Sequence, residues 1–184
     1  SKTSPWEYQH SSFTPIVLNY LGPQGHIVDV GCGSGRNAFY LAQMGFKITA
    51  FDPSEVAIRK AKAQNTTVSF VVGNAESIRL EDACADGVLC AWVLSFCSDA
   101  DSCIKEMQRI TKSGGYIFLA THLDLTTEQG VRTEYVNEDG LLNSFLGWSV
   151  LHKQRYVEHM SAGADPHEGI HSHNSLKLVL RKPK

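Results

Sequence analysis

The sequence predicts an α/β protein with a doubly wound, seven-stranded sheet that is mostly parallel and ends in an antiparallel hairpin. Three observations lead to this fold. Short apolar segments alternate with amphipathic helical segments between residues 26 and 120. A glycine-rich turn follows the first apolar segment, and the last two strand signals have no helix signal between them. Strand–helix alternation indicates a parallel sheet covered on both faces.

Local signals set the expected bounds of each element. Gly45 is placed to end the first helix, and Ser54 is placed to cap the second helix directly after Pro53. The turn Ser113-Gly114-Gly115 precedes the fifth strand. The expected strands are 26–30, 47–51, 68–72, 87–91 and 116–120, and the expected helices are 36–44, 54–63 and 101–111.

The end of the chain has a different pattern. A helix is expected over 138–146, followed by strands at 148–157 and 176–181 that are joined by a polar loop. Two consecutive strands without a crossover helix pair antiparallel. We expect the strand at 148–157 to run parallel to its neighbour in the sheet, so that the loop 158–175 begins at the carboxyl end of the sheet, where ligands bind in open α/β folds.

Length and composition favour one domain over 1–184, with a lid or edge segment at 1–25, a core at 26–120 and a substrate-side region at 121–184. The formal net charge of −2 gives no overall attraction to nucleic acid or to an anionic membrane. The five cysteines contain no CxxC pair, which favours reduced thiols in a cytoplasmic protein over a disulfide framework. No apolar stretch approaches the length of about 20 residues that spans a bilayer, and the first residues do not resemble a secretory leader.

The stretch VDVGCGSGRN, residues 28–37, carries three glycines in five positions. A dinucleotide-binding fingerprint would place a small residue three positions after the second glycine, where this chain has Arg36. A phosphate-binding P-loop would need a lysine after the last glycine, and none is present. What remains is an acidic residue, Asp29, followed by glycines at alternate positions.

In this form the sequence resembles the class I S-adenosylmethionine-dependent methyltransferases. Further segments match that family in order: TAFDPS, VVGNAES, ADGVLCAWVLSF and MQRITKSGGYIFL. With GCGSGRN and the GW at 147–148, they look most like the small tellurite-resistance-type methyltransferases. The resemblance implies a Rossmann-like fold, S-adenosylmethionine as cofactor and S-adenosylhomocysteine as product.

The resemblance also implies which residues bind the cofactor. Asp52 would accept hydrogen bonds from the ribose hydroxyls, Asn74 would accept one from the adenine amine, and Asp29 would brace the glycine turn. The full expected cofactor set is Asp29, Gly31, Cys32, Gly33, Gly35, Asp52, Pro53, Asn74, Ala75, Glu76, Cys90, Ala91 and Trp92. The expected substrate-binding residues are Arg36, Ser95, Phe96 and His122.

Histidines gather near the end of the chain and are candidates for the catalytic groups. The topology carries the loop 158–175 toward the mouth of the site, so we expect His171 and His173, then His159, to orient the acceptor or act as a general base. A polar surface loop is the alternative interpretation. The HxH spacing alone is a weak metal signal, and no metal site is expected.

The favoured function is transfer of a methyl group to a small-molecule acceptor by in-line displacement, in which the enzyme chiefly aligns acceptor, methyl carbon and sulfur. The alternative is a non-catalytic S-adenosylmethionine-binding regulatory or assembly subunit, and an NAD-linked oxidoreductase comes third. The expected partner is the small-molecule methyl acceptor, without nucleic acid or membrane, and the expected state is a monomer or homodimer.

Overall fold

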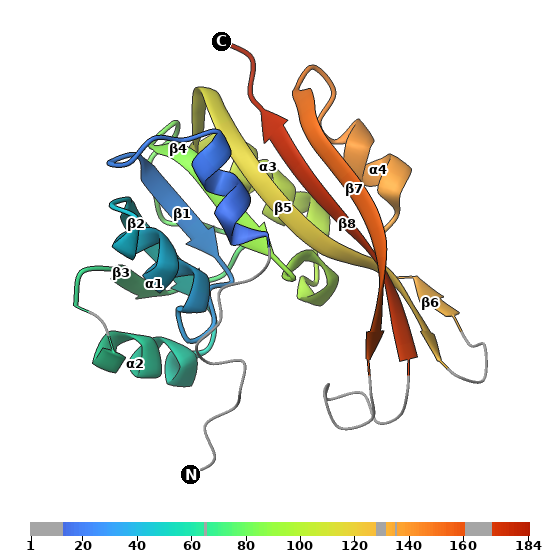
Figure 1. The fold of residues 1–184 in the computed structure, drawn as a ribbon, viewed down its shortest axis with the longest axis horizontal. Helices are drawn as coiled ribbons and strands as arrows, with labels where there is room; N and C mark the ends of the chain where they lie inside the picture. Colours follow the sequence, from blue (N-terminus) through green and yellow to red (C-terminus); the bar gives the residue numbers. More distant parts are fainter. Residues whose placement is uncertain (1–12, 65, 128–131, 135, 161–170) are drawn as a thin grey trace.

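The computed structural model describes residues 13–64, 66–127, 132–134, 136–160 and 171–184. Its main sheet has the strand order β3-β2-β1-β4-β5-β8-β7, and β6 pairs with β5 beside this path (Figure 1). The strands are β1 (His26–Val30), β2 (Lys47–Asp52), β3 (Ser69–Val72), β4 (Ala85–Ala91), β5 (Thr111–Thr127), β6 (Arg132–Glu134), β7 (Ser149–Met160) and β8 (His171–Arg181). The helices are η2 (Thr14–Asn19), α1 (Arg36–Gln43), α2 (Glu55–Gln64), η3 (Leu94–Phe96), α3 (Ala100–Ile110) and α4 (Glu138–Asn143).

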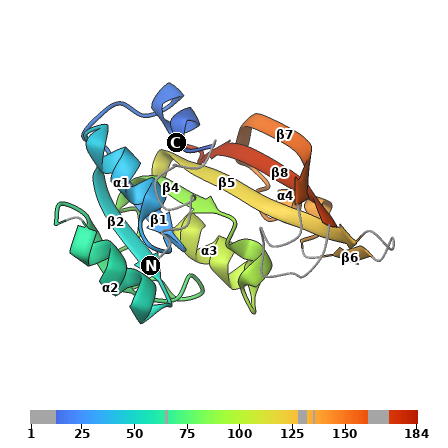
Figure 2. The same ribbon diagram turned by 60° about the horizontal axis from the view of Figure 1, so that its bottom comes forward.

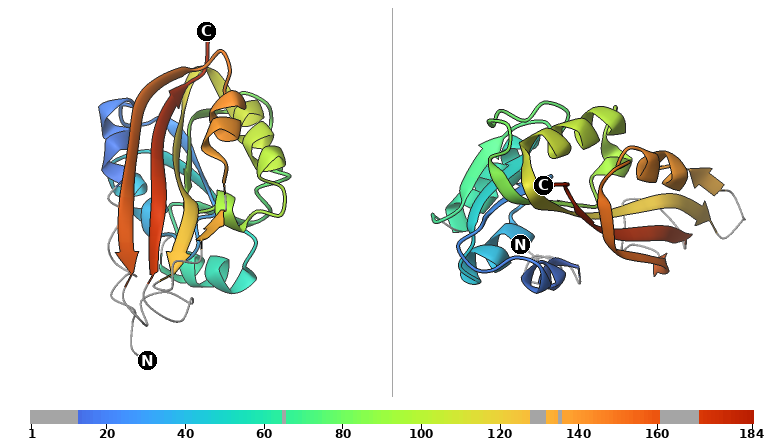
Figure 3. Two further views of the ribbon diagram at one scale, coloured as in Figure 1. Left: turned by 90° about the vertical axis from the view of Figure 1, so that its right-hand side faces the viewer. Right: turned by 90° about the horizontal axis from the view of Figure 1, so that it is seen from above.

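The predicted doubly wound architecture is confirmed. Strands β1 to β5 pair in parallel, and two apolar cores cover the two faces of the sheet. One core packs α1, α2 and η2 against residues such as Ile27 and Phe118, and the other packs α3 and α4 against Val28 and Leu119. The right-hand view of Figure 3 shows α3 and α4 on one side of the sheet and η2 on the other.

The C-terminal hairpin is confirmed, but its expected placement was wrong in one respect. Strand β8 lies between β5 and β7 and is antiparallel to both, so the direct neighbour of β7 is antiparallel. Because two antiparallel steps restore the direction, β7 still runs parallel to β5, and its carboxyl end lies at the same edge of the sheet. Figure 2 shows β5, β8 and β7 continuing beyond the part of the sheet that α1 and α2 cover.

Strands β5 and β8 are longer than their sequence patterns indicated. The pairing of Thr127 with His171 continues the ladder beyond Ala120 and Leu176, where the expected strands stopped or began. The polar run at 171–175 has little apolar character, yet its backbone groups are satisfied by partners on both sides. Strand β6 was not expected, and α4 ends three residues before the expected Leu146.

The described part of the N-terminal segment packs on the α1 side of the sheet. Phe13 is 2% exposed, and Val17 in η2 is fully buried in the same core. Residues 1–12 of the segment expected as a lid or edge, which include Trp6 and Tyr8, lie outside the described residues. Among the described helices, none combines the length and apolar character needed to cross a bilayer.

Arg109 of α3 fixes the loop between β3 and β4. Its guanidinium donates to the carbonyls of Ile78 and Leu80, each at 2.8 Å, and pairs with Asp82 at 2.7 Å and Glu106 at 2.8 Å. Glu106 in turn accepts the Ile78 N–H at 2.7 Å. This network orders the chain directly after residues 73–76, which makes it part of the support for the candidate site.

We expect Arg109→Met to lower the free energy of unfolding by about 1.5 to 3 kcal/mol, because it removes charge-assisted hydrogen bonds from two carbonyls and two carboxylates. Lys105→Met is the matched control, since Lys105 is exposed on the same helix. Denaturant titration of both variants measures the difference. Equal stability of the two variants would show that the Arg109 network does not stabilise the loop.

Candidate functional site

The turn after β1 is built from three glycines with positive φ: Gly31 at 70°, Gly33 at 55° and Gly35 at 92°. A Cβ on Gly31 would collide with Val93, and a Cβ on Gly35 would lie 2.8 Å from Phe39. A Cβ on Gly33 would meet nothing within 4 Å. The packing of neighbouring side chains therefore explains why positions 31 and 35 are glycine. At Gly33 the space beside the backbone is open, as close approach of a ligand requires.

Asp52 at the end of β2 ties this turn to the sheet. Its Oδ2 accepts the Gly33 N–H at 2.8 Å, and its Oδ1 accepts the Ser54 N–H at 2.9 Å. The Cys32 N–H donates to the carbonyl of Phe51 at 2.8 Å. A carboxylate oxygen accepts more than one hydrogen bond, so Asp52 retains capacity for donors from a ligand.

Asp29 lies beneath the turn and is 1% exposed. Burial, with the nearby Asp52 charge, raises the pKa of Asp29 to about 7, while Arg36 and the Ala38 backbone N–H act in the opposite direction. Among the described residues, Oδ2 of Asp29 has no hydrogen-bond partner. A buried carboxyl with an unsatisfied oxygen beside an open turn favours occupation of the neighbouring space by a cationic ligand.

A pocket of about 250 Å³ opens beside the turn. It lies between the ends of β1 and β2, the segment after β3 and the segment after β4, and its walls are Gly31, Pro53, Gly73, Asn74, Ala75, Glu76, Val93, Phe96, Cys97 and Ser98. Five of the residues expected at the cofactor are in these walls: Gly31, Pro53, Asn74, Ala75 and Glu76. Phe96, expected at the substrate, is also there and is 75% exposed.

Glu76 joins two walls of this pocket. Its Oε1 accepts the Ser98 hydroxyl at 2.8 Å and the Asp99 N–H at 2.9 Å, and its Oε2 accepts the Asn74 amide at 3.1 Å. These bonds, chiefly the one from Asp99, lower the pKa of Glu76. Asn74 Oδ1 accepts the Glu76 N–H at 3.2 Å, so a bond from adenine would use its second lone pair.

A second group of side chains lies where β4, β5 and β8 approach the carboxyl edge. The rings of Trp92 and His122 stack with centroids 4.6 Å apart, His122 stacks on His173 at 4.0 Å, and His171 meets His173 edge-on at 4.9 Å. We call Trp92, His122, His173 and His171 the imidazole stack. Trp92 has a positive φ of 67°, a disfavoured conformation for a bulky residue.

Polar groups from β7 and β8 border the imidazole stack. His122 Nδ1 lies 3.0 Å from Ser175 Oγ and 3.9 Å from a carboxylate oxygen of Glu158. Lys177 Nζ lies 4.4 Å from the ring centroid of Tyr156. Burial raises the pKa of Glu158 and lowers that of Lys177. Burial, with the Glu158 charge, also raises the pKa of Tyr156.

Sequence reasoning did not single out Tyr156, Glu158 and Lys177. Their positions beside His173 depend on the register of β7 with β8, in which Tyr156 pairs with Ser175 and Glu158 with His173. The sequence predicts a strand at 148–157 but not its register.

The remaining predicted residues are distributed as follows. His159 is exposed and pairs with Ser172, which places it on the opposite face of the hairpin from His173. The structure therefore does not bring His159 to the imidazole stack. Cys90 is fully buried within the core, Cys32 is nearly buried, and Ala91 is partly buried at the end of β4. Ser95 lies in η3, and its buried hydroxyl has no hydrogen-bond partner among the described residues.

A larger cavity, of about 540 Å³, lies on the α4 side of the hairpin. Its walls include Asp124, Val136, Glu138, Arg155 and Asn174. Glu138 is already paired there with Arg155 at 2.7 Å and Lys153 at 2.8 Å. Among the described residues, none from the carboxyl ends of β1 or β2 lines this cavity, so its size does not make it the cofactor site.

The chain is similar to known methyltransferases over part of its length. Residues 28–119, half of the chain, match the model of the methyltransferase domain family. The malonyl-[acyl-carrier protein] O-methyltransferase of Pectobacterium atrosepticum is 32% identical over 98 residues, which are 53% of this chain and 39% of that protein. The thiol S-methyltransferase TMT1B of Mus musculus is 31% identical over 116 residues, 58% of this chain and 47% of that protein. The chain thus spans half or less of the length of these relatives.

Among solved structures, TehB from Haemophilus influenzae superposes with a TM-score of 0.75 at 20% identity, covering 92% of this chain and 61% of that chain. This likeness concerns the fold. The family match includes the glycine turn, Asp52 and the segment 74–76. The chain therefore belongs to the methyltransferase domain family and has the fold of the class I S-adenosylmethionine-dependent methyltransferases.

Proposed function

We propose that this protein transfers a methyl group from S-adenosylmethionine to a small-molecule acceptor bound beside the imidazole stack. The observation that carries the proposal is the open space at Gly33, whose N–H donates to Asp52, in the same turn as Gly31, which lines a pocket of about 250 Å³. Open α/β sheets bind ligands outside the carboxyl ends of their strands, which is where this pocket lies.

The residues present fit the cofactor. Asp52 offers carboxylate lone pairs at the end of β2, and Ala75 gives the pocket an apolar wall. Asp29 offers buried negative charge near the turn, which favours a ligand bearing a sulfonium or an ammonium group. When bound, S-adenosylmethionine supplies an electrophilic methyl carbon, and the protein has to align the acceptor with it.

The imidazole stack supports the assignment of the acceptor side. Trp92 and Val93 are consecutive at the end of β4, and Val93 lines the pocket while Trp92 stacks on His122. His122 stacks on Trp92, and His173 stacks on His122. Both imidazoles are thus connected through Trp92 to Val93, which lines the pocket. An imidazole in this position can take a proton from a hydroxyl or thiol acceptor as the new bond to carbon forms.

The relatives act on oxygen in one case and on sulfur in the other, by their names. A panel of thiols, phenols, carboxylic acids and amines, each incubated with S-adenosylmethionine, tests the proposal by release of S-adenosylhomocysteine. With a compact thiol, phenol or carboxylic acid, we expect one S-adenosylhomocysteine to be released for each acceptor molecule that is methylated. Tight cofactor binding without release in any arm would favour a non-catalytic binding subunit instead.

The Asp52 carboxylate provides the first prediction about the proposed site. Asp52→Ala is expected to weaken binding of S-adenosylhomocysteine by about 1.5 to 3 kcal/mol, tenfold or more, because charge-assisted hydrogen bonds to the ribose are lost. Isothermal titration calorimetry gives the dissociation constants, with Asp101→Ala in the first turn of α3 as the control. An unchanged constant in Asp52→Ala would contradict the assignment.

Asp29 predicts how binding depends on pH. Its carboxyl is mostly neutral below its pKa of about 7 and charged above it, and a cationic ligand prefers the charged form. Affinity for S-adenosylmethionine should therefore rise as pH increases toward 7, by up to about tenfold per pH unit for one linked proton, and then level off. Asp29→Asn should remove this dependence of affinity on pH. Calorimetric titrations of the wild-type protein and the variant at several pH values below and above 7 measure it. Identical pH profiles would exclude Asp29 as the coupled group.

The third prediction concerns the imidazole stack. Replacing His171 and His173 together by alanine is expected to reduce kcat about a hundredfold or more, while S-adenosylhomocysteine affinity stays within about twofold, because the cofactor contacts lie on other strands. His152→Ala is the control, since His152 lies near the opposite end of β7, paired with Val179. Thermal melting of each variant verifies that it is folded. Full turnover in the folded double variant would show that these imidazoles do not act on the acceptor.

A further inference from the structure

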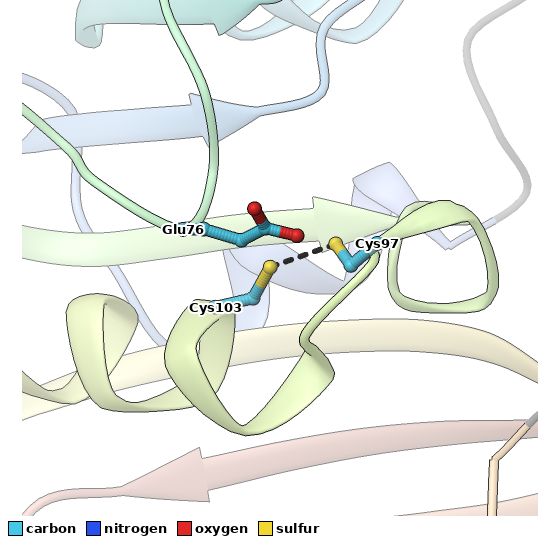
Figure 4. Close-up of side chains that lie close together, drawn as sticks. All are labelled: Glu76, Cys97 and Cys103. Carbon is cyan, nitrogen blue, oxygen red and sulfur yellow. Dashed lines mark hydrogen bonds between the residues drawn. The ribbon is translucent and has the colours of Figure 1, made fainter.

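Two thiols outside the proposed chemistry lie in contact behind the cofactor pocket. Cys97 ends η3, and Cys103 lies in α3. The Cys103 thiol donates to the Cys97 sulfur over an Sγ–Sγ distance of 2.7 Å, and Glu76 lies beside both (Figure 4). Cys97 is partly exposed and lines the pocket, whereas Cys103 is 1% exposed.

We propose that Cys97 and Cys103 form a reversible disulfide, with Cys97 as the site of attack on a low-molecular-weight disulfide and Cys103 as the resolving thiol. This inference goes beyond the proposed methyl transfer. It assigns a modification site to the wall of the cofactor pocket, and it concerns thiols that the transfer reaction does not use.

The geometry favours a bond between the sulfurs over a metal ion shared by them. A disulfide requires a separation of about 2.05 Å, so the two sulfurs need to approach by only about 0.7 Å. Two thiolates on a tetrahedral zinc ion stand about 3.8 Å apart, which would require them to separate. Glu76 completes a group of ligand atoms within 4.8 Å of one another, but its oxygens already accept bonds from Asn74, Ser98 and Asp99.

The exchange balances without further reactants. The Cys97 thiolate attacks one sulfur of the small disulfide, forms a mixed disulfide and releases one small thiolate. The Cys103 thiol then loses its proton to solvent and attacks the Cys97 sulfur, which releases the second small thiolate. The small disulfide is reduced to two thiols, and the protein dithiol is oxidised.

The electrostatics assign the two roles. The hydrogen bond from Cys103 lowers the pKa of Cys97, while the same bond and burial raise the pKa of Cys103. The partly exposed sulfur is therefore the better nucleophile toward an external reagent. Once Cys97 carries a small thiol, the bond that held the Cys103 proton is gone, which favours the second step.

The pocket connects this chemistry to cofactor occupancy. Cys97 and Ser98 are in its wall together with Gly31 and Glu76, so a nucleoside bound in the pocket lies against Cys97 and limits the approach of a reagent from that side. We therefore expect saturating S-adenosylhomocysteine to slow oxidation about tenfold, as expected for a reagent that must wait for an unoccupied pocket.

The test begins with the full chain in its reduced form, which is incubated with glutathione disulfide. The remaining thiols are then alkylated, and the protein is digested without added reductant by a protease that cleaves before aspartate. Asp99 and Asp101 lie between the two cysteines, so a Cys97–Cys103 disulfide joins the fragments 86–98 and 101–123, and fragmentation of the joined product distinguishes Cys97 from Cys90 in the first fragment. We expect joined fragments lacking two hydrogen atoms, which separate on reduction. In Cys103→Ser the reaction should stop at a glutathione adduct on Cys97. Cys84→Ala is the control, because Cys84 precedes β4 whereas Cys97 follows it, and this variant should behave like the wild-type protein.

Three results would overturn the proposal. The first is a stable glutathione adduct on Cys97 of the wild-type protein with no joined fragments. The second is oxidation at an unchanged rate under saturating S-adenosylhomocysteine, with binding verified by calorimetry, which would refute the link to the pocket. The third is a reduced protein that holds one equivalent of zinc, lost in Cys103→Ser, since this would assign the thiols to a metal.

Discussion

The hydrogen bond from the Gly33 N–H to Asp52, 2.8 Å long, joins the turn after β1 to the end of β2 and sets the geometry of the cofactor side. It forms because β1 and β2 are parallel neighbours in register, with Val30 beside Phe51, so that both chains leave the sheet at the same edge. The turn must then bend back over that edge, which the positive φ values at 31, 33 and 35 permit. The bond leaves the space beside Gly33 open, and Gly31 of the same turn lines the pocket.

The end of β4 divides the site into two halves. Val93 faces the pocket with Gly31, whereas Trp92, with its unusual positive φ, turns toward His122 and the hairpin. The cofactor half rests on parallel strands and on the loop that Arg109 holds. The proposed acceptor half lies on β5, β8 and β7, whose antiparallel pairing stacks imidazoles from two strands on one face. A strained residue at this division is consistent with a functional constraint on its position.

The two halves differ in how far the sequence predicts them. Gly33, Asp52 and Asn74 were expected from the resemblance to the methyltransferase family, whose motifs each lie within a few consecutive residues. The imidazole stack is different. His122 and His173 meet through the register of β5 with β8, which shifts at a bulge between His122 and Asp124, and a one-residue slip would turn every side chain to the other face. The same reason explains why His159 was expected near the site and lies on the opposite face, and why Glu158 and Tyr156 were not expected there.

We propose that the cofactor approaches the open backbone at Gly33. Gly33→Ala tests it directly, since the added Cβ has no protein atom within 4 Å to meet and costs only about 1 to 2 kcal/mol of stability at a positive φ. Calorimetric titration of this variant with S-adenosylhomocysteine, after a melting curve has shown it to be folded, is the measurement. We expect a folded protein whose binding is at least about tenfold weaker, because the Cβ occupies the space of the ligand. A folded variant that binds with the wild-type dissociation constant would contradict it.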